Sequence, residues 1–229
     1  AYVRLPRHLR WELYPIPHEG ARAAHGGSYL ENLDWWTRPL PHDRGAMLRA
    51  MAAEIVTLKG VREHNPRLWA WSFPFHLGLY LLMASSVLLA AGGLVEIFGG
   101  VRLASAGLLG QATHRLTYFL EVSGGLLALI GTAGLLARRL ADRDLRAYTP
   151  PAALLNLGFL LALVLVGLAA RHLADPTAAL LRARVGEVLS FQFRHGGVLP
   201  DGSVLAAGTP PLVDLELCLF AVFAGYLPY

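Results

Sequence analysis

Long uncharged apolar runs recur along the last two thirds of the chain. The run at 73–95 (FPFHLGLYLLMASSVLLAAGGLV) contains no Asp, Glu, Lys or Arg, and the run at 152–171 is uncharged up to Arg171. Two further runs, at 115–137 and 209–229, carry acidic residues within them. About 20 helical residues cross roughly 30 Å of hydrocarbon, so each run is long enough to span a membrane. The pattern predicts an all-α integral-membrane protein, an up-down transmembrane helix bundle with four visible spans.

The composition supports the membrane class and excludes others. Of 229 residues, 55% are hydrophobic and only 16% are charged, which is too apolar for an ordinary soluble domain. The net charge of +4 comes from Lys and Arg that flank the apolar runs, so it indicates membrane topology, and no nucleic-acid partner is expected. The single cysteine, Cys218, and the lack of a CxxC pair mean that any iron–sulfur cluster belongs to a partner.

The distribution of basic residues predicts an orientation. Segment 1–72, which prolines interrupt, and the tight loop ARRLADRDLRAY hold most of the Lys and Arg, so both are placed in the cytoplasm. Residues 73–229 then form the transmembrane bundle. The loop at about 172–208 lies on the outer side, where its glycines and prolines predict turns and no further span.

One piece of the N-terminal segment has a helical pattern. Residues 45–59 place apolar side chains at helical spacing opposite charged ones, which suits a helix at the membrane surface or under a partner; an ordinary packing helix is the alternative. The apolar positions are Met47, Leu48, Met51, Ile55 and Leu58, and the charged ones are Arg49, Glu54 and Lys59.

His76 is the first candidate for chemistry, because it stands among aromatic and aliphatic residues inside a predicted span. A neutral imidazole is the usual axial ligand of b-type haem. The alternatives are a hydrogen bond to a carbonyl on the next helix, a quinone contact or a proton relay. Since His76 lies near the cytoplasmic end of its span, a second axial ligand is expected from the N-terminal segment, where His64 is nearest, or beyond Tyr229.

A second group of candidates lies near the outer ends of the spans. His114 and His172 lie there on consecutive spans and could ligate a second haem iron. They are too far from the cytoplasmic end of the bundle to share an iron with His76. Alternatively, His114 with Arg115 and Glu121 forms a quinone site, in which a donor polarises a quinone oxygen and a carboxylate or imidazole takes the proton. Ordinary interfacial residues are the third interpretation.

Small residues on the second span allow close approach of another helix or of a flat macrocycle, and helix packing is the more common use. They are Gly124, Gly125, Gly131 and Gly134.

Several motifs together resemble a known family. They are SFPFHLGLYLL, GLLALIGTAGLLARRL, DLRAYTP, SFQFRHGG and the final LPY. The chain is similar in these to the membrane cytochrome b family of respiratory nitrate reductase gamma subunits. The closer likeness is to the heterodisulfide-reductase-associated (DsrM) type of sulfur-cycling complexes, which shares a stretch like RWELYPIPHE.

The resemblance implies a five-helix subunit in the prokaryotic cytoplasmic membrane, with one or two b haems and menaquinone as exchangeable substrate. It implies an iron–sulfur, heterodisulfide-reductase-like partner on the cytoplasmic side and further membrane and periplasmic cytochrome subunits. A fifth helix would precede Ala1, and the last haem ligand would follow Tyr229. His76 matches the family's cytoplasmic-side ligand, whereas Ser86 and Glu216 stand where the nitrate-reductase pattern has other ligands, which makes His114 and His172 candidate substitutes.

The expected function is therefore that of a b-type cytochrome subunit of a quinone-linked oxidoreductase complex. It would exchange electrons between menaquinone or menaquinol and the cytoplasmic iron–sulfur partner. The alternative is a haem-free membrane anchor or assembly subunit. A small transporter is less well supported, because no internal inverted repeat is visible.

Overall fold

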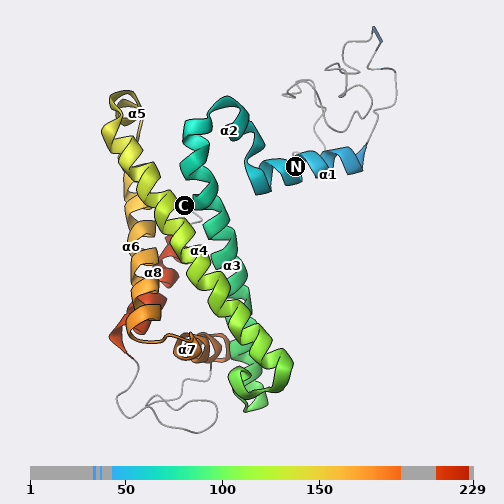
Figure 1. Ribbon diagram of the computed structural model, residues 1–229, viewed down its shortest axis with the longest axis vertical. Helices are drawn as coiled ribbons and strands as arrows, with labels where there is room; N and C mark the ends of the chain where they lie inside the picture. Colours follow the sequence, from blue (N-terminus) through green and yellow to red (C-terminus); the bar gives the residue numbers. More distant parts are fainter. Residues whose placement is uncertain (1–32, 35–36, 38–42, 192–209, 227–229) are drawn as a thin grey trace. The chain divides into compact units, whose positions relative to one another are not determined.

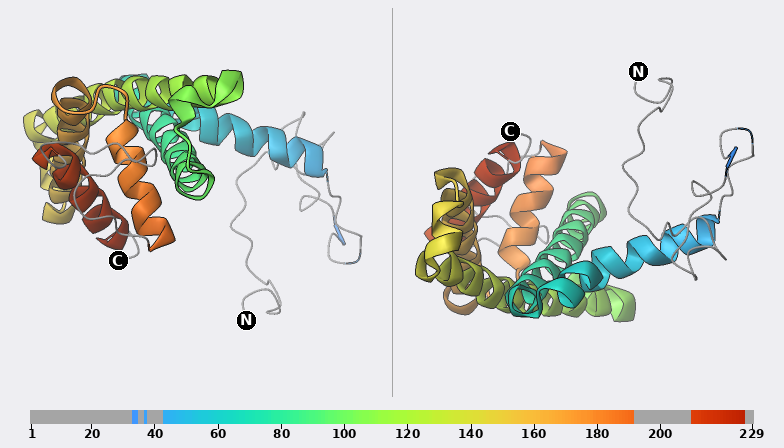
Figure 2. Two further views of the ribbon diagram at one scale, coloured as in Figure 1. Left: turned by 90° about the horizontal axis from the view of Figure 1, so that it is seen from below. Right: turned by 90° about the horizontal axis from the view of Figure 1, so that it is seen from above.

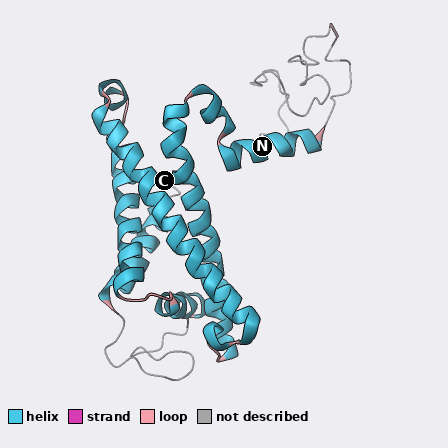
Figure 3. Ribbon diagram, in the orientation of Figure 1, coloured by secondary structure: helices cyan, strands magenta, loops and turns pink. Residues whose placement is uncertain are grey.

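The computed structural model describes residues 33–34, 37, 43–191 and 210–226, and the chain divides into two compact units, Ala1–Asn65 and Pro66–Tyr229. All regular secondary structure in these described residues is helical (Figure 3). The predicted all-α class is thus confirmed.

The N-terminal unit contains two short helices, α1 (Arg44–Thr57) and α2 (Lys59–His64). Asp43 begins α1 by accepting a hydrogen bond from the backbone N–H of Ala46 at 2.9 Å, and Leu58, with φ of 50°, ends it in the left-handed conformation. The helix predicted at 45–59 is therefore present. Its apolar side chains stand exposed within this unit, and no residue of α1 is buried.

Three helices of the second unit are long and apolar enough to cross a membrane. They are α3 (Pro66–Gly99), α4 (Gly107–Ala141) and α6 (Pro151–Leu173), and each contains one of the predicted spans. At about 1.5 Å per residue, the 34 residues of α3 extend for roughly 51 Å, so its ends reach past the hydrocarbon layer or the helix tilts within it.

The predicted fourth span forms a shorter helix, α8 (Pro211–Tyr226), of 16 residues. Its length of about 24 Å falls below the thickness of the hydrocarbon layer. Residues 227–229 of that predicted span lie outside the described part. A bundle of four spans is therefore not confirmed, and the described chain has three helices that qualify.

Short elements connect the long ones. A 3-10 turn, η6 (Leu103–Ser105), joins α3 to α4, and α5 (Arg143–Ala147) follows α4 after Asp142, whose carboxylate accepts hydrogen bonds from the backbone of the next turn. The outer segment at about 172–208, for which turns were predicted, contains the helix α7 (Ala179–Ser190). Gly186 is the only glycine or proline within α7, and the other glycines of this segment follow Phe191. The turn-forming residues therefore do not prevent a helix here.

Within this unit α3 and α4 run antiparallel, α6 packs against α4, α8 packs against α6, and α7 crosses one end of the bundle (Figure 1). Views along the bundle place α7 between α3 and α8 (Figure 2). The helix α7 thus closes the end at which α3 finishes and α4 begins.

Glycines let the helices touch backbone to backbone. A Cβ atom built on Gly78 of α3 would lie 2.7 Å from the carbonyl oxygen of Gly124 and 2.8 Å from the Cα of Ala128, both on α4. One built on Gly93 would lie 2.8 Å from the backbone nitrogen of Gly186 in α7. These close contacts fix the register of α3 against α4 and α7.

We predict that Gly78→Ala destabilises the bundle by about 1–3 kcal/mol, because the added methyl group meets only backbone atoms, which cannot rotate away. The matched control is Gly158→Ala in α6, where a Cβ meets nothing within 4 Å and stability should be kept or rise slightly. Thermal unfolding in detergent measures both. Equal midpoints for the two variants would contradict the close α3–α4 contact.

Candidate functional site

A buried guanidinium, that of Arg171 at the end of α6, organises the end of the bundle near α7. Its side chain is 3% exposed and faces three carboxylates. Its Nε lies 3.0 Å from Glu121 Oε1 on α4, and its Nη2 donates to Glu216 Oε2 on α8 at 2.7 Å. Its Nη1 donates to Asp175 Oδ2 at 2.8 Å and also to the Asp175 carbonyl. We call these four residues the Arg171 cluster.

Asp175 serves two purposes in the Arg171 cluster. Besides its pair with Arg171, its carboxylate accepts hydrogen bonds from the backbone N–H groups of Ala179 at 3.0 Å and Leu181 at 2.9 Å. It thereby satisfies amides in the first turn of α7, which the helix itself leaves without acceptors. The cluster and the position of α7 consequently depend on each other.

A second buried guanidinium, Arg182 of α7, connects α7 to α3 and α4. Its side chain is 1% exposed; Nη1 lies 3.6 Å from Glu96 Oε1 of α3 and 2.9 Å from His114 Nδ1 of α4. The same Glu96 oxygen accepts a hydrogen bond from the Leu103 backbone N–H at 2.9 Å. Arg182 Nη2 and Nε are buried without a hydrogen-bond partner in the described part of the chain.

The contact with Arg182 fixes the tautomer of His114. Arginine only donates hydrogen bonds, so His114 Nδ1 must be the acceptor. An imidazole that accepts at Nδ1 is neutral and carries its proton on Nε2. His114 therefore offers an N–H donor at its second ring nitrogen.

His76 has the opposite arrangement. Its Nδ1 lies 2.7 Å from the carbonyl oxygen of Ser72, which only accepts, so Nδ1 carries the proton. The ring meets Phe75 edge-on, with centroids 5.0 Å apart. Nε2 keeps its lone pair and has no hydrogen-bond partner among the described residues. A histidine that ligates a metal commonly donates its other N–H to a carbonyl in this way.

The two histidines lie at different depths. Ser85 of α3 donates to the carbonyl oxygen of Thr117 on α4 at 3.2 Å, which sets the register of these antiparallel helices. His114, three residues before Thr117, is then level with Leu88, twelve residues after His76. The separation along the bundle is about 18 Å, too far for the two imidazoles to share an iron.

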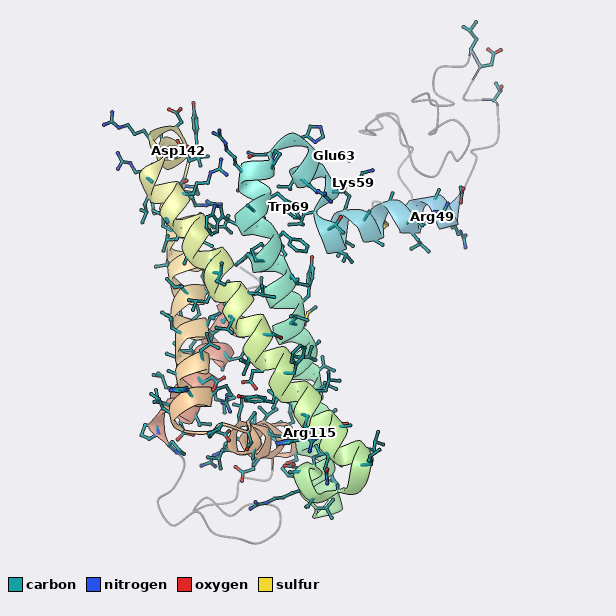
Figure 4. The ribbon with its side chains drawn as sticks, in the orientation of Figure 1. Arg49, Lys59, Glu63, Trp69, Arg115 and Asp142 are labelled. Atoms are coloured by element: carbon teal, nitrogen blue, oxygen red, sulfur yellow. The ribbon has the colours of Figure 1, made fainter. Side chains whose placement is uncertain are left out.

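His172 and Arg115 are not brought into these contacts. His172 is exposed on α6. Since Arg171 meets Glu121 across the α4–α6 contact, His172 is level with a position about six residues beyond His114, or about 9 Å deeper. Arg115 is exposed on α4, at the opposite end of the bundle from Trp69 and Asp142 (Figure 4). Of the predicted quinone trio, His114 and Glu121 face the buried network and Arg115 does not.

Most of the small residues of α4 pack against other helices. Gly124, Gly131 and Gly134 lie against Leu81, Phe75 and Trp71 of α3, and Gly125 lies against Leu168 of α6. At these glycines the prediction of helix packing holds, because protein atoms fill the space that a flat macrocycle would need.

The sequence interpretation missed Asp175, Arg182 and Glu96 as members of buried networks. Arg171 was noted only as the end of the uncharged run at 152–171, and Glu96 falls just after the predicted first span. The available signal was charge pairing: acids and bases gathered near the same ends of apolar helices are expected to satisfy one another, because lipid satisfies neither.

Comparisons of the chain with protein-family models, with curated proteins and with solved structures found no match.

We predict that Arg171→Gln destabilises the protein by about 3–5 kcal/mol, because it leaves buried carboxylates without their cation. Arg115→Gln, an exposed change on α4, should alter stability by less than about 0.5 kcal/mol. Thermal unfolding and the yield of folded protein from membranes report both effects. A tolerated Arg171→Gln would contradict the organising role of the cluster.

Proposed function

We propose that this chain is a b-type cytochrome subunit of a quinone-linked redox complex in the prokaryotic cytoplasmic membrane. It would exchange electrons between menaquinone or menaquinol and an iron–sulfur partner, with the N-terminal unit on the cytoplasmic side. Three apolar helices suggest a multi-pass membrane protein. The observation that carries the proposal is the state of His76, an imidazole of an apolar helix whose Nδ1–H is bonded and whose Nε2 has no partner in the described part of the chain.

The residues around His76 fit a haem ligand. The Ser72 carbonyl holds the ring in one tautomer, and Phe75 supports it from the side, so Nε2 is presented in a fixed direction. Haem b, when bound there, supplies one-electron chemistry. His64 belongs to the other unit, so a second ligand for this haem stays an expectation for the N-terminal segment.

The residues around His114 fit a quinone better than a second haem. Its Nε2 carries a proton, so this nitrogen has no lone pair for iron but can donate to a quinone oxygen. The difference in depth from His172, and the exposure of His172, add to this argument. We therefore favour one haem at His76, with His114 as the donor to quinone and Arg182 as the residue that positions it.

We predict that His76→Ala removes the α band of reduced b-type haem from the purified protein. The matched control is His172→Ala, an exposed histidine whose loss should leave the spectrum and the haem-to-protein ratio unchanged. Reduced-minus-oxidised optical spectra of both variants test this. Haem-free wild-type protein would favour the haem-free anchor subunit instead, and an unchanged spectrum in His76→Ala would contradict His76 as the haem ligand.

We predict that His114→Leu lowers kcat/KM for haem reduction by a menaquinol analogue by roughly 100-fold, because the donor to the quinone oxygen is lost. His114→Gln keeps an N–H donor and should recover part of the rate. Arg115→Gln, one residue along on the exposed face, should react like the wild type. Stopped-flow spectroscopy measures all three, and loss of haem from His114→Leu would instead support the role of His114 as an iron ligand.

A further inference from the structure

The Arg171 cluster contains more acids than bases. One guanidinium faces three carboxylates, which leaves two negative charges in excess if all of them are ionised. The adjacent network adds one guanidinium, one carboxylate and a neutral imidazole, so it does not offset this excess. The charged groups that act on Glu121 from the packed elements are Arg171 of α6, Asp175, Glu216 of α8 and Arg182 of α7. Arg182 is itself in contact with Glu96 of α3 and His114 of α4.

Asp175 is the member whose carboxylate accepts the most hydrogen bonds. Its two carboxylate oxygens accept from the Arg171 guanidinium and from the amides of Ala179 and Leu181, and these donors lie at the N-terminal end of α7, where a negative charge is favoured. Asp175 alone therefore balances the charge of Arg171.

The two glutamates differ in how well they are satisfied. Glu216 accepts a hydrogen bond from Arg171 Nη2 at 2.7 Å. Glu121 touches Nε at 3.0 Å without hydrogen-bond geometry, and its other oxygen, Oε2, is buried with no partner in the described part of the chain. If Glu121 were ionised, one of its two oxygens would be buried without a donor. Burying the ionised group in this way costs more free energy than burying the neutral acid.

We propose that Glu121 is a proton-binding site of this protein, a carboxylic acid that holds a proton on Oε2 and exchanges it with a water or ligand oxygen. The bound proton reduces the excess charge of the cluster from two to one. Because Oε2 has no partner among the described residues, the proton can leave from it without breaking a bond inside the cluster. The inference does not depend on haem; in the proposed quinone chemistry, the same group would exchange the proton that accompanies electron transfer.

Infrared spectroscopy of the wild-type protein in membranes tests the site. At pH 6, where an ordinary glutamate is ionised, the spectrum should contain the C=O stretching band of a protonated carboxylic acid, with a small shift in D2O, and Glu121→Gln should remove it. The matched control is Glu187→Gln in α7, because Glu187 is also buried but has its own guanidinium partner, Arg184, at 2.8 Å. The band should persist in that control. A wild type without the band, or a band that survives Glu121→Gln, would overturn the proposal.

A second variant tests the charge balance even if Glu121→Gln fails to fold. Glu216→Gln removes one negative charge beside Arg171, so Glu121 should lose its proton, and the band should disappear, at a lower pH than in the wild type. An unchanged titration would overturn the proposal. The optical spectrum of the same samples reports haem separately, so failure of the proton site and failure of the cytochrome assignment are distinguishable.

Discussion

The buried guanidinium of Arg171 is the constraint on which this end of the bundle depends. A cation that lies 3% exposed beside apolar helices must find its partners inside the protein, and it finds them on α4, on α8 and in the turn before α7. The pairs join residues as far apart in the chain as 121 and 171. The short helix α8 is thereby held to α6 by an ion pair, in addition to apolar contacts such as that between Phe159 and Phe223.

The same constraint extends to the candidate chemistry. Asp175 couples Arg171 to the first turn of α7, and α7 in turn directs Arg182 at His114. This network gives His114 the tautomer of a donor, while the Ser72 carbonyl gives His76 the tautomer of a ligand. The two imidazoles lie about 18 Å apart in depth. His76 offers a lone pair at Nε2, whereas His114 offers an N–H donor there. Such a separation suits a protein that moves electrons between two levels of a membrane.

Hydropathy is a local property of the sequence, so the positions of the apolar helices could be predicted from it. The runs at 73–95, 115–137 and 152–171 all lie within observed helices, and the helical pattern at 45–59 marks α1. Three results required the structure. The described part of the run at 209–229 contains a helix of 16 residues, the segment before Phe191 forms α7, and the partners of Glu121 and His114 are arginines 50 and 68 positions away. Pairing across such distances depends on how α7 and the glycine contacts pack the helices together. The hydrophobic periodicity of the sequence does not predict that packing.

His76 and His114 carry their protons on opposite ring nitrogens, and their proposed roles as haem ligand and quinone donor depend on this difference. Nitrogen-15 NMR of the reduced protein with labelled histidine tests it most directly, with the signals of His76 and His114 assigned from single-site variants. We expect a proton on Nδ1 of His76, with Nε2 bare or bound to iron, and a proton on Nε2 of His114, with Nδ1 bare. A proton on Nε2 of His76, or on Nδ1 of His114, would contradict the account.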